Sequence, residues 1–229
     1  MSVSRKSLMA SAGTCVLCLF VGVASAATNY EEHWDAGDTN GWIGSTTSST
    51  VVRDNADGNP ASSIVVRRDL SPPVFDMGVT SELADVTGNY GGVPGWMLSF
   101  DAKYDIGNFA DTLVRFRYQD ATFNGWHLDV ADAFPANSWQ SYSVTFDPNW
   151  TDAQATANGW VDETGGAVSW QQLMGDVYHP EIRFVMGDEL SAIAHVDNVV
   201  LKSVPEPTMS ALGLWGLLGA GMLVRRKYD

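Results

Sequence analysis

Residues 96–104 read Trp-Met-Leu-Ser-Phe-Asp-Ala-Lys-Tyr, and this stretch decides the fold class. Its larger apolar side chains occupy every second position: Trp96, Leu98, Phe100, Ala102 and Tyr104. Side chains along a strand point alternately to its two faces, so this spacing predicts a strand that packs one face on a core. The intervening polar residues, such as Asp101 and Lys103, are expected on the opposite face.

The same alternation recurs along the chain. It predicts further strands over residues 62–68, 112–118, 126–131, 141–146, 181–186 and 193–202. Turn signals such as Asp57-Gly58-Asn59-Pro60 and Gly165-Gly166 separate them, and only residues 169–177 have helical spacing. Many short strands with little helix predict an all-β fold, an antiparallel β-sandwich, and their number suits a jelly roll.

The last of these strands contains a change of phase. Ala194 and Val196 share one face, whereas Val199 and Leu201 lie an odd number of residues further along. A β-bulge at Asp197-Asn198 would turn both apolar pairs inward, so we predict one there.

The amino terminus has the features of a secretory signal peptide. Arg5 and Lys6 precede an apolar run over residues 8–23, which ends in Ala24-Ser25-Ala26. A charged segment, an apolar segment and small residues at the cleavage site predict removal of residues 1–26 by signal peptidase. Both cysteines of the chain lie within this segment, so the mature protein is expected to lack a disulfide.

The carboxy terminus carries a second signal, over residues 204–229. Pro205, Glu206 and Pro207 are followed by an almost uncharged stretch and then by Arg225 and Arg226. This order resembles the PEP-CTERM sorting domain. The resemblance implies a Gram-negative bacterium, processing near the Pro-Glu-Pro motif by exosortase, an integral-membrane cysteine peptidase, and a location at the cell envelope or in the extracellular matrix. The hydrophobic helix over residues 208–224 would anchor the protein in the inner membrane only until it is processed.

The folded part, residues 27–203, is strongly acidic. It contains 25 acidic and eight basic residues once the charges of the two terminal signals are left out. This balance argues against binding to nucleic acid or to an anionic membrane, since phosphate groups require a basic surface. It leaves a neutral glycan, a cationic partner or a divalent metal as ligands.

Three pieces of the folded part resemble a laminin B domain and, more broadly, the galactose-binding-like jelly rolls. They are the Gly-Trp pair at Trp42, the segment 88–92 before Leu98, and the ending 196–201. The resemblance implies a sandwich with a structural calcium ion between the first strand, an early loop and the last strand. Here those ligands would be Glu31 or Glu32, Asp57, Asn59 and Asp197. No other cofactor is expected.

Tryptophan is the residue that favours a carbohydrate ligand, because an exposed indole offers a flat apolar surface for a sugar ring. Trp42, Trp96 and Trp126 start or lie within predicted strands and are expected in the core. Trp150 and Trp160 flank residues 151–158, which we expect to form a loop. These two and Trp139 are therefore the predicted sugar-stacking residues.

No catalytic motif stands out. The four histidines lack the spacing of a zinc site, and no Gly-x-Ser-x-Gly sequence occurs. With 25 acidic residues available, no carboxylate pair can be selected as the acid and nucleophile of a glycosidase. The sequence therefore predicts no enzyme, but an exported protein that binds carbohydrate or belongs to an extracellular polysaccharide matrix. Two alternatives stay open: a structural or adhesion protein that binds proteins or itself, and a glycan-active enzyme.

Overall fold

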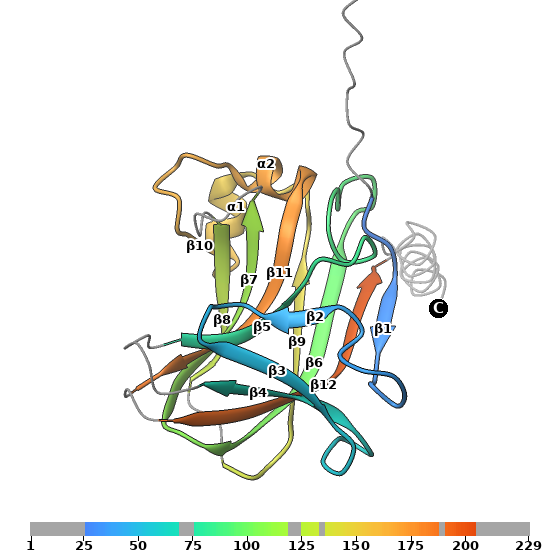
Figure 1. Cartoon of the computed structure of the whole chain (residues 1–229). Coiled ribbons are helices and arrows are strands. Elements are labelled where there is room, and N and C mark those ends of the chain that lie inside the picture. Colours follow the sequence, from blue (N-terminus) through green and yellow to red (C-terminus); the bar gives the residue numbers. More distant parts are fainter. Residues whose placement is uncertain (1–25, 69–75, 119–124, 133–135, 188–190, 205–229) are drawn as a thin grey trace, which may run out of the picture.

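The computed structural model describes residues 26–68, 76–118, 125–132, 136–187 and 191–204. They form two packed antiparallel sheets, which confirms the predicted β-sandwich (Figure 1). The first sheet has the order β3 (Ser49–Asp54), β4 (Ser63–Arg68), β12 (Ala192–Ser203), β6 (Trp96–Ile106) and β9 (Gln140–Phe146), with β1 (Tyr30–Glu32) beside β12. The second has the order β10 (Val161–Asp162), β8 (Gly125–Asp132), β7 (Phe109–Tyr118), β11 (Val177–Met186), β5 (Asp76–Ser81) and β2 (Trp42–Gly44).

The core lies between the sheets and is rich in aromatic rings. Alternating residues of β6 supply Leu98 and Phe100, which are buried as the sequence predicts. From the facing sheet, Phe116 on β7 contacts Phe146 on β9, with ring centroids 4.9 Å apart. Burying one such side chain contributes about 1.5–3 kcal/mol, so this aromatic core is a main source of stability.

The phase change in the last strand is a bulge, as predicted. The register between β12 and β6 shifts between Asp197 and Val200, and Asn198 has a positive φ of 51°. Asparagine tolerates this left-handed conformation better than most residues. Val196 and Val199 on either side of the shift are both buried.

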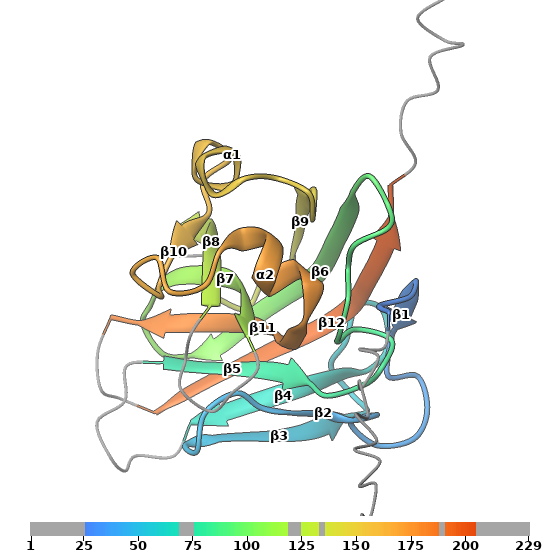
Figure 2. The ribbon, with the colours of Figure 1, turned by 90° about the horizontal axis from the view of Figure 1, so that it is seen from above.

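Two short helices lie together at one end of the sandwich, beside β10 (Figures 1 and 2). Helix α2 (Trp170–Gly175) falls within the predicted helical segment. Helix α1 (Asp152–Ala157) occupies the segment that we expected to be a loop. The hydroxyl of Thr151 accepts a hydrogen bond from the N–H of Gln154, and the side-chain oxygen of Gln154 accepts one from the N–H of Thr151. This capping box satisfies two free N–H groups at the start of the helix.

The two predicted terminal signals lie outside the described residues, apart from Ala26 and Val204 at their inner ends. The predicted sorting residues Pro205, Glu206, Pro207, Arg225 and Arg226 are therefore not part of the structural description. Within the described ranges, no helix has the length and hydrophobicity needed to cross a membrane.

Candidate functional site

The outer face of the second sheet carries a concentration of charged and polar side chains. We call it the arginine face, and it comprises Thr80, Arg115, Arg117, His127, His179, Glu181 and Arg183. The register places these residues side by side across four strands: Arg115 pairs with His127 on one side and with Glu181 on the other, and Glu181 pairs with Thr80. Three of the eight basic residues of the folded part thus lie on one face.

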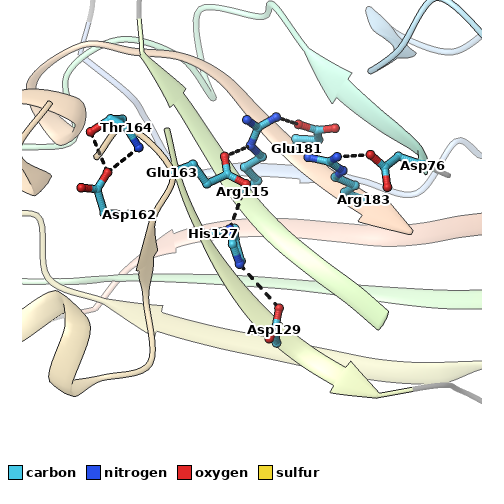
Figure 3. Close-up of polar contacts among 9 residues, drawn as sticks. All are labelled: Asp76, Arg115, His127, Asp129, Asp162, Glu163, Thr164, Glu181 and Arg183. Atoms are coloured by element: carbon cyan, nitrogen blue, oxygen red, sulfur yellow. Dashed lines mark hydrogen bonds and ion pairs between the residues drawn. The ribbon is translucent and has the colours of Figure 1, made fainter. Parts of the chain in front are cut away.

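Ion pairs hold the centre of this face in place (Figure 3). The Nε of Arg115 donates to Glu163 at 2.5 Å, and its Nη1 lies 3.3 Å from Glu181. Glu163 also bonds the Nδ1 of His127 at 2.9 Å, and Arg183 pairs with Asp76. The side chains of Arg115 and Glu181 are only 3% and 2% exposed, so these charges are largely shielded from water.

The loop after β10 positions Glu163. The Oδ1 of Asp162 accepts hydrogen bonds from the backbone N–H and the hydroxyl of Thr164, both at 2.6 Å (Figure 3). Its Oδ2 accepts from the N–H of Gly166. These bonds outweigh the effect of burial and lower the pKa of Asp162. The tight turn therefore fixes the carboxylate that stabilises Arg115.

Burial and charge act in opposite directions on the groups of this face. Burial alone would raise the pKa of Glu163, but the bonds from His127 and Arg115 outweigh it and lower that pKa. Burial lowers the pKa of Arg117, and the neighbouring Arg115 guanidinium adds to this effect. For Arg183, Asp76 more than offsets burial and raises the pKa. On this face, carboxylates thus pair with the guanidinium groups of Arg115 and Arg183.

One aromatic ring stands exposed at this face. Tyr178 is 43% exposed and lies at a register shift of β11, between Val177 and His179. A bulge of this kind re-aims a side chain relative to the regular strand. The tyrosine ring contacts the ring of His179, with centroids 4.0 Å apart.

Trp160, one of the predicted sugar-stacking residues, is in the core, and its prediction is wrong. It is 1% exposed and stacks on Phe116 at a centroid distance of 5.5 Å. The expected loop contains the helix α1, and the backbone N–H of Trp160 donates to the backbone carbonyl of Ala155 in that helix. The indole therefore offers no surface to a sugar.

The other two predicted tryptophans lie in different places. Trp150 is partly buried and packs against Trp170, with centroids 6.0 Å apart. Trp139 is also partly exposed, but it lies just before β9, with its ring 5.6 Å from the Nζ of Lys103. Neither belongs to the arginine face, and whether they bind a sugar stays a prediction.

The structure divides the predicted calcium ligands. Glu32 accepts hydrogen bonds from the N–H of Trp34 and from Asn40, and Glu31 bonds His33 at 2.9 Å. Asp57 pairs with Lys103. Each of these carboxylates thus has a partner of its own, and binding of one calcium ion by the predicted set stays a prediction.

Asn59 and Asp197, by contrast, are together. The N–H of Asn59 donates to Asp197 at 2.6 Å, and its side-chain amide donates to Asp101 at 3.0 Å. Asn198 completes the group, since its N–H bonds Asp197 and its side-chain amide bonds Asp101 at 2.7 Å. Asp101 and Asn198 thus join Asn59 and Asp197 in one bonded group, and calcium binding there stays a prediction.

A separate acidic group includes Asp57. Within the described residues, ligand atoms of Asp57, Asp105 and His195 lie within 4.8 Å of one another. Lys103 bonds both aspartates. Burial alone would lower the pKa of Lys103, but the two carboxylates outweigh it and raise that pKa. The lysine ammonium already supplies the positive charge here, so this group has the composition of an ion-pair network.

The arginine face is not evident from the sequence alone. Its signal was present, since Arg115 and Arg117 alternate with buried residues of β7, as Glu181 and Arg183 do on β11. The alternation of residue types along each strand does not show that β7 pairs with β11. That pairing brings the arginines of β7 beside Glu181 and Arg183 of β11.

Comparisons with known proteins bear on the fold. No family model matches the chain, and no curated protein matches it. Among solved structures, an exo-beta-agarase superposes with a TM-score of 0.54 at 9% identity, covering 78% of this chain and 25% of that chain. The CBM22-1 xylan-binding domain from Paenibacillus barcinonensis Xyn10C gives 0.49 at 13% identity, covering 80% of this chain and 98% of that one. The family 11 carbohydrate-binding module from Clostridium thermocellum gives 0.45 at 15% identity, covering 79% and 99%.

Proposed function

We propose that the folded part binds a polysaccharide on the arginine face without cleaving it. The observation that carries this proposal is the exposed ring of Tyr178, which contacts His179 on a face whose central side chains ion pairs already hold in place. A sugar ring stacks on an exposed aromatic side chain, and its hydroxyl groups bond charged side chains strongly. Because these side chains are ordered before binding, little conformational entropy is lost when the ligand arrives.

The charge of the protein supports an uncharged chain as the ligand. The folded part has a large acidic excess, which repels polyanions at long range. On the arginine face itself the carboxylates of Glu163, Glu181 and Asp76 pair with Arg115 and Arg183. A neutral glycan does not compete for these ion pairs.

The terminal signals support an extracellular setting for this activity. We propose that signal peptidase removes residues 1–26 and that an exosortase-like membrane peptidase processes the tail 204–229. The protein then acts at the envelope or in the polysaccharide matrix of a Gram-negative bacterium. An exported glycan-binding protein meets its ligand there.

Calorimetry with soluble neutral glycans tests the binding proposal. Wild-type protein is titrated with xylan, mixed-linkage β-glucan and cello-oligosaccharides, with alginate as the anionic comparison. We expect a neutral glycan to bind and Tyr178→Ala to weaken it about tenfold, the loss of one stacking contact. Full affinity in Tyr178→Ala together with loss in Trp139→Ala would move the site to the first sheet. Release of reducing ends would contradict the non-catalytic role.

A second candidate function is self-association in a matrix. Strand β9 lies at the edge of the first sheet and carries no charged residue from Gln140 to Phe146. Uncharged edge strands are templates for pairing with another chain. Analytical ultracentrifugation of wild type and of Ser143→Lys distinguishes this role, which requires a dimer that the lysine disrupts.

A further inference from the structure

His179 has a buried nitrogen atom that lacks a hydrogen-bond partner among the described residues. The residue is 6% exposed, and its Nδ1 lies 3.0 Å from the hydroxyl of Thr80. That hydroxyl donates its own hydrogen to the carbonyl of Pro180 at 2.7 Å, so it accepts one from Nδ1. A neutral imidazole with its hydrogen on Nδ1 presents a lone pair at Nε2, and Nε2 is the atom without a partner.

A second acceptor faces this lone pair. The Oε1 of Glu82, in the segment just after β5, lies 3.6 Å from Nε2. Both atoms are hydrogen-bond acceptors when the histidine is neutral, and two facing acceptors do not bond each other. An unsatisfied buried polar atom destabilises the folded state. Each of these two acceptors requires a hydrogen-bond donor of its own.

We propose that His179 Nε2 and the Glu82 carboxylate accept hydrogen bonds from two neighbouring hydroxyl groups of a sugar ring that stacks on Tyr178. This inference rests on the proposed function and names the chemical feature that the site selects. Hydroxyl oxygens on adjacent ring carbons are separated by about a hydrogen-bond length, ~2.8 Å, close to the spacing of the two acceptors. The ligand class is a neutral glycan with a free vicinal diol.

The surroundings favour hydroxyl donors over a cation. Arg117 on β7 pairs with His179 across the sheet and is close enough to lower its pKa. A metal ion or an ammonium group between His179 and Glu82 would be repelled by this guanidinium. Neutral hydroxyl groups supply the missing hydrogens without that repulsion.

Glu82 provides the access to the buried atom. Its side chain is 61% exposed, whereas that of His179 is 7% exposed. The glutamate side chain can turn towards solvent as the two hydroxyl groups arrive, and the buried imidazole keeps its position through Thr80. The site therefore combines one fixed and one adjustable acceptor.

Protonation of His179 removes the lone pair on which the site depends. Burial and the charge of Arg117 lower its pKa, while Glu82 opposes them. Among the described residues, Tyr178 on the same strand is a further titratable group in contact with the ring. At neutral pH the acceptor is present; below the pKa of His179, Nε2 carries a hydrogen and pairs with Glu82. We therefore expect affinity to fall on acidification.

Two glucose hexasaccharides that differ only in linkage test the inference. Interior rings of cellohexaose, which is 1,4-linked, keep hydroxyl groups on adjacent carbons, whereas those of laminarihexaose, which is 1,3-linked, do not. We expect wild type to prefer cellohexaose about tenfold in calorimetry, from one to two hydrogen bonds. His179→Phe and Glu82→Ala should each reduce this preference at least threefold, whereas Thr145→Ala on β9 should keep it.

The outcomes separate this inference from the proposed function. Equal affinity for both hexasaccharides, unchanged by His179→Phe and Glu82→Ala, would overturn the inference and leave glycan binding intact. Absence of binding to any glycan would overturn both. If His179→Phe does not fold, Glu82→Ala and the pH dependence of wild-type affinity decide. Affinity for cellohexaose that is constant from pH 8 to 4 contradicts the role of the imidazole.

Discussion

Asp101 on β6 and Asp197 on β12 lie directly opposite each other in the antiparallel ladder, and both side chains are buried. Their exposed fractions are 8% and 1%, and their hydrogen-bond donors are the amides of Asn59 and Asn198. Two neighbouring carboxylates in a shielded position repel each other when both are ionised. This pair should therefore influence stability through pH and through cations.

The first prediction concerns pH. Burial raises the pKa of Asp197, and the charge of Asp101 adds to it. The folded state thus binds this proton more tightly than the unfolded state. Protonation of Asp197 therefore adds to the unfolding free energy at low pH, and this contribution is lost as the pH rises through the pKa of the folded state. Asp101→Asn removes the repulsion and should raise the unfolding free energy at pH 7 by about 1 kcal/mol. Urea unfolding at pH 7 and pH 4 measures this, and a loss of stability at pH 7 would contradict it.

The second prediction concerns calcium. Carboxylate and amide oxygens are the ligands that Ca²⁺ prefers, and a divalent ion would neutralise Asp101 and Asp197 together. We expect millimolar CaCl₂ to raise the melting temperature of the wild type and to leave that of Asp197→Asn unchanged. Asp105→Asn, in the separate group around Lys103, is the matched control and should respond like the wild type. Equilibrium dialysis that finds no bound calcium, with melting unaffected by chelator, would show the prediction to be wrong.

The third prediction concerns the centre of the arginine face. Glu181 is 2% exposed and lies within reach of Arg115, Arg117 and Arg183. Glu181→Gln removes the negative charge that faces these buried guanidinium groups. Breaking a buried ion pair in this way costs about 3–5 kcal/mol. Asp129→Asn, whose side chain is 61% exposed, should change stability little. Denaturant unfolding that finds both variants equal to wild type would exclude a structural role for the network.

The fourth prediction separates the core from the ligand surface. Trp160→Ala should destabilise the protein by about 3–5 kcal/mol, because a buried indole leaves a cavity when it is removed. Trp139→Ala, at a partly exposed position, should cost much less. A small effect of Trp160→Ala on unfolding, together with a specific loss of glycan affinity, would contradict the core assignment.

Trp160 marks the difference between what local periodicity predicts and what depends on the packing of distant segments. Alternation identified the long strands and even the bulge at Asp197-Asn198, because the periodicity of a strand is a local property. The predicted exposure of Trp160 rests on a loop over residues 151–158. This segment instead forms a helix, and the capping box at Thr151 and Gln154 is the sequence signal for it. The arginine face and the Asp101–Asp197 pair depend on which strands become neighbours. Strand order is a tertiary property that period-2 patterns leave open.

The last prediction concerns the sorting tail. The described chain closes with β12, and the N–H of Val204 bonds the carbonyl of Gly95 at 2.8 Å, immediately before Pro205. Cleavage at the Pro-Glu-Pro motif would thus leave the final strand of the first sheet complete, so the mature protein can lose the tail without losing the sandwich. We expect mass spectrometry of the surface-located form to find no peptides from residues 213–229. Replacing Pro205 and Pro207 with alanine should retain the tail, whereas Val204→Ala should not. Intact tail peptides on wild-type protein at the surface would mean that the helix is a permanent anchor.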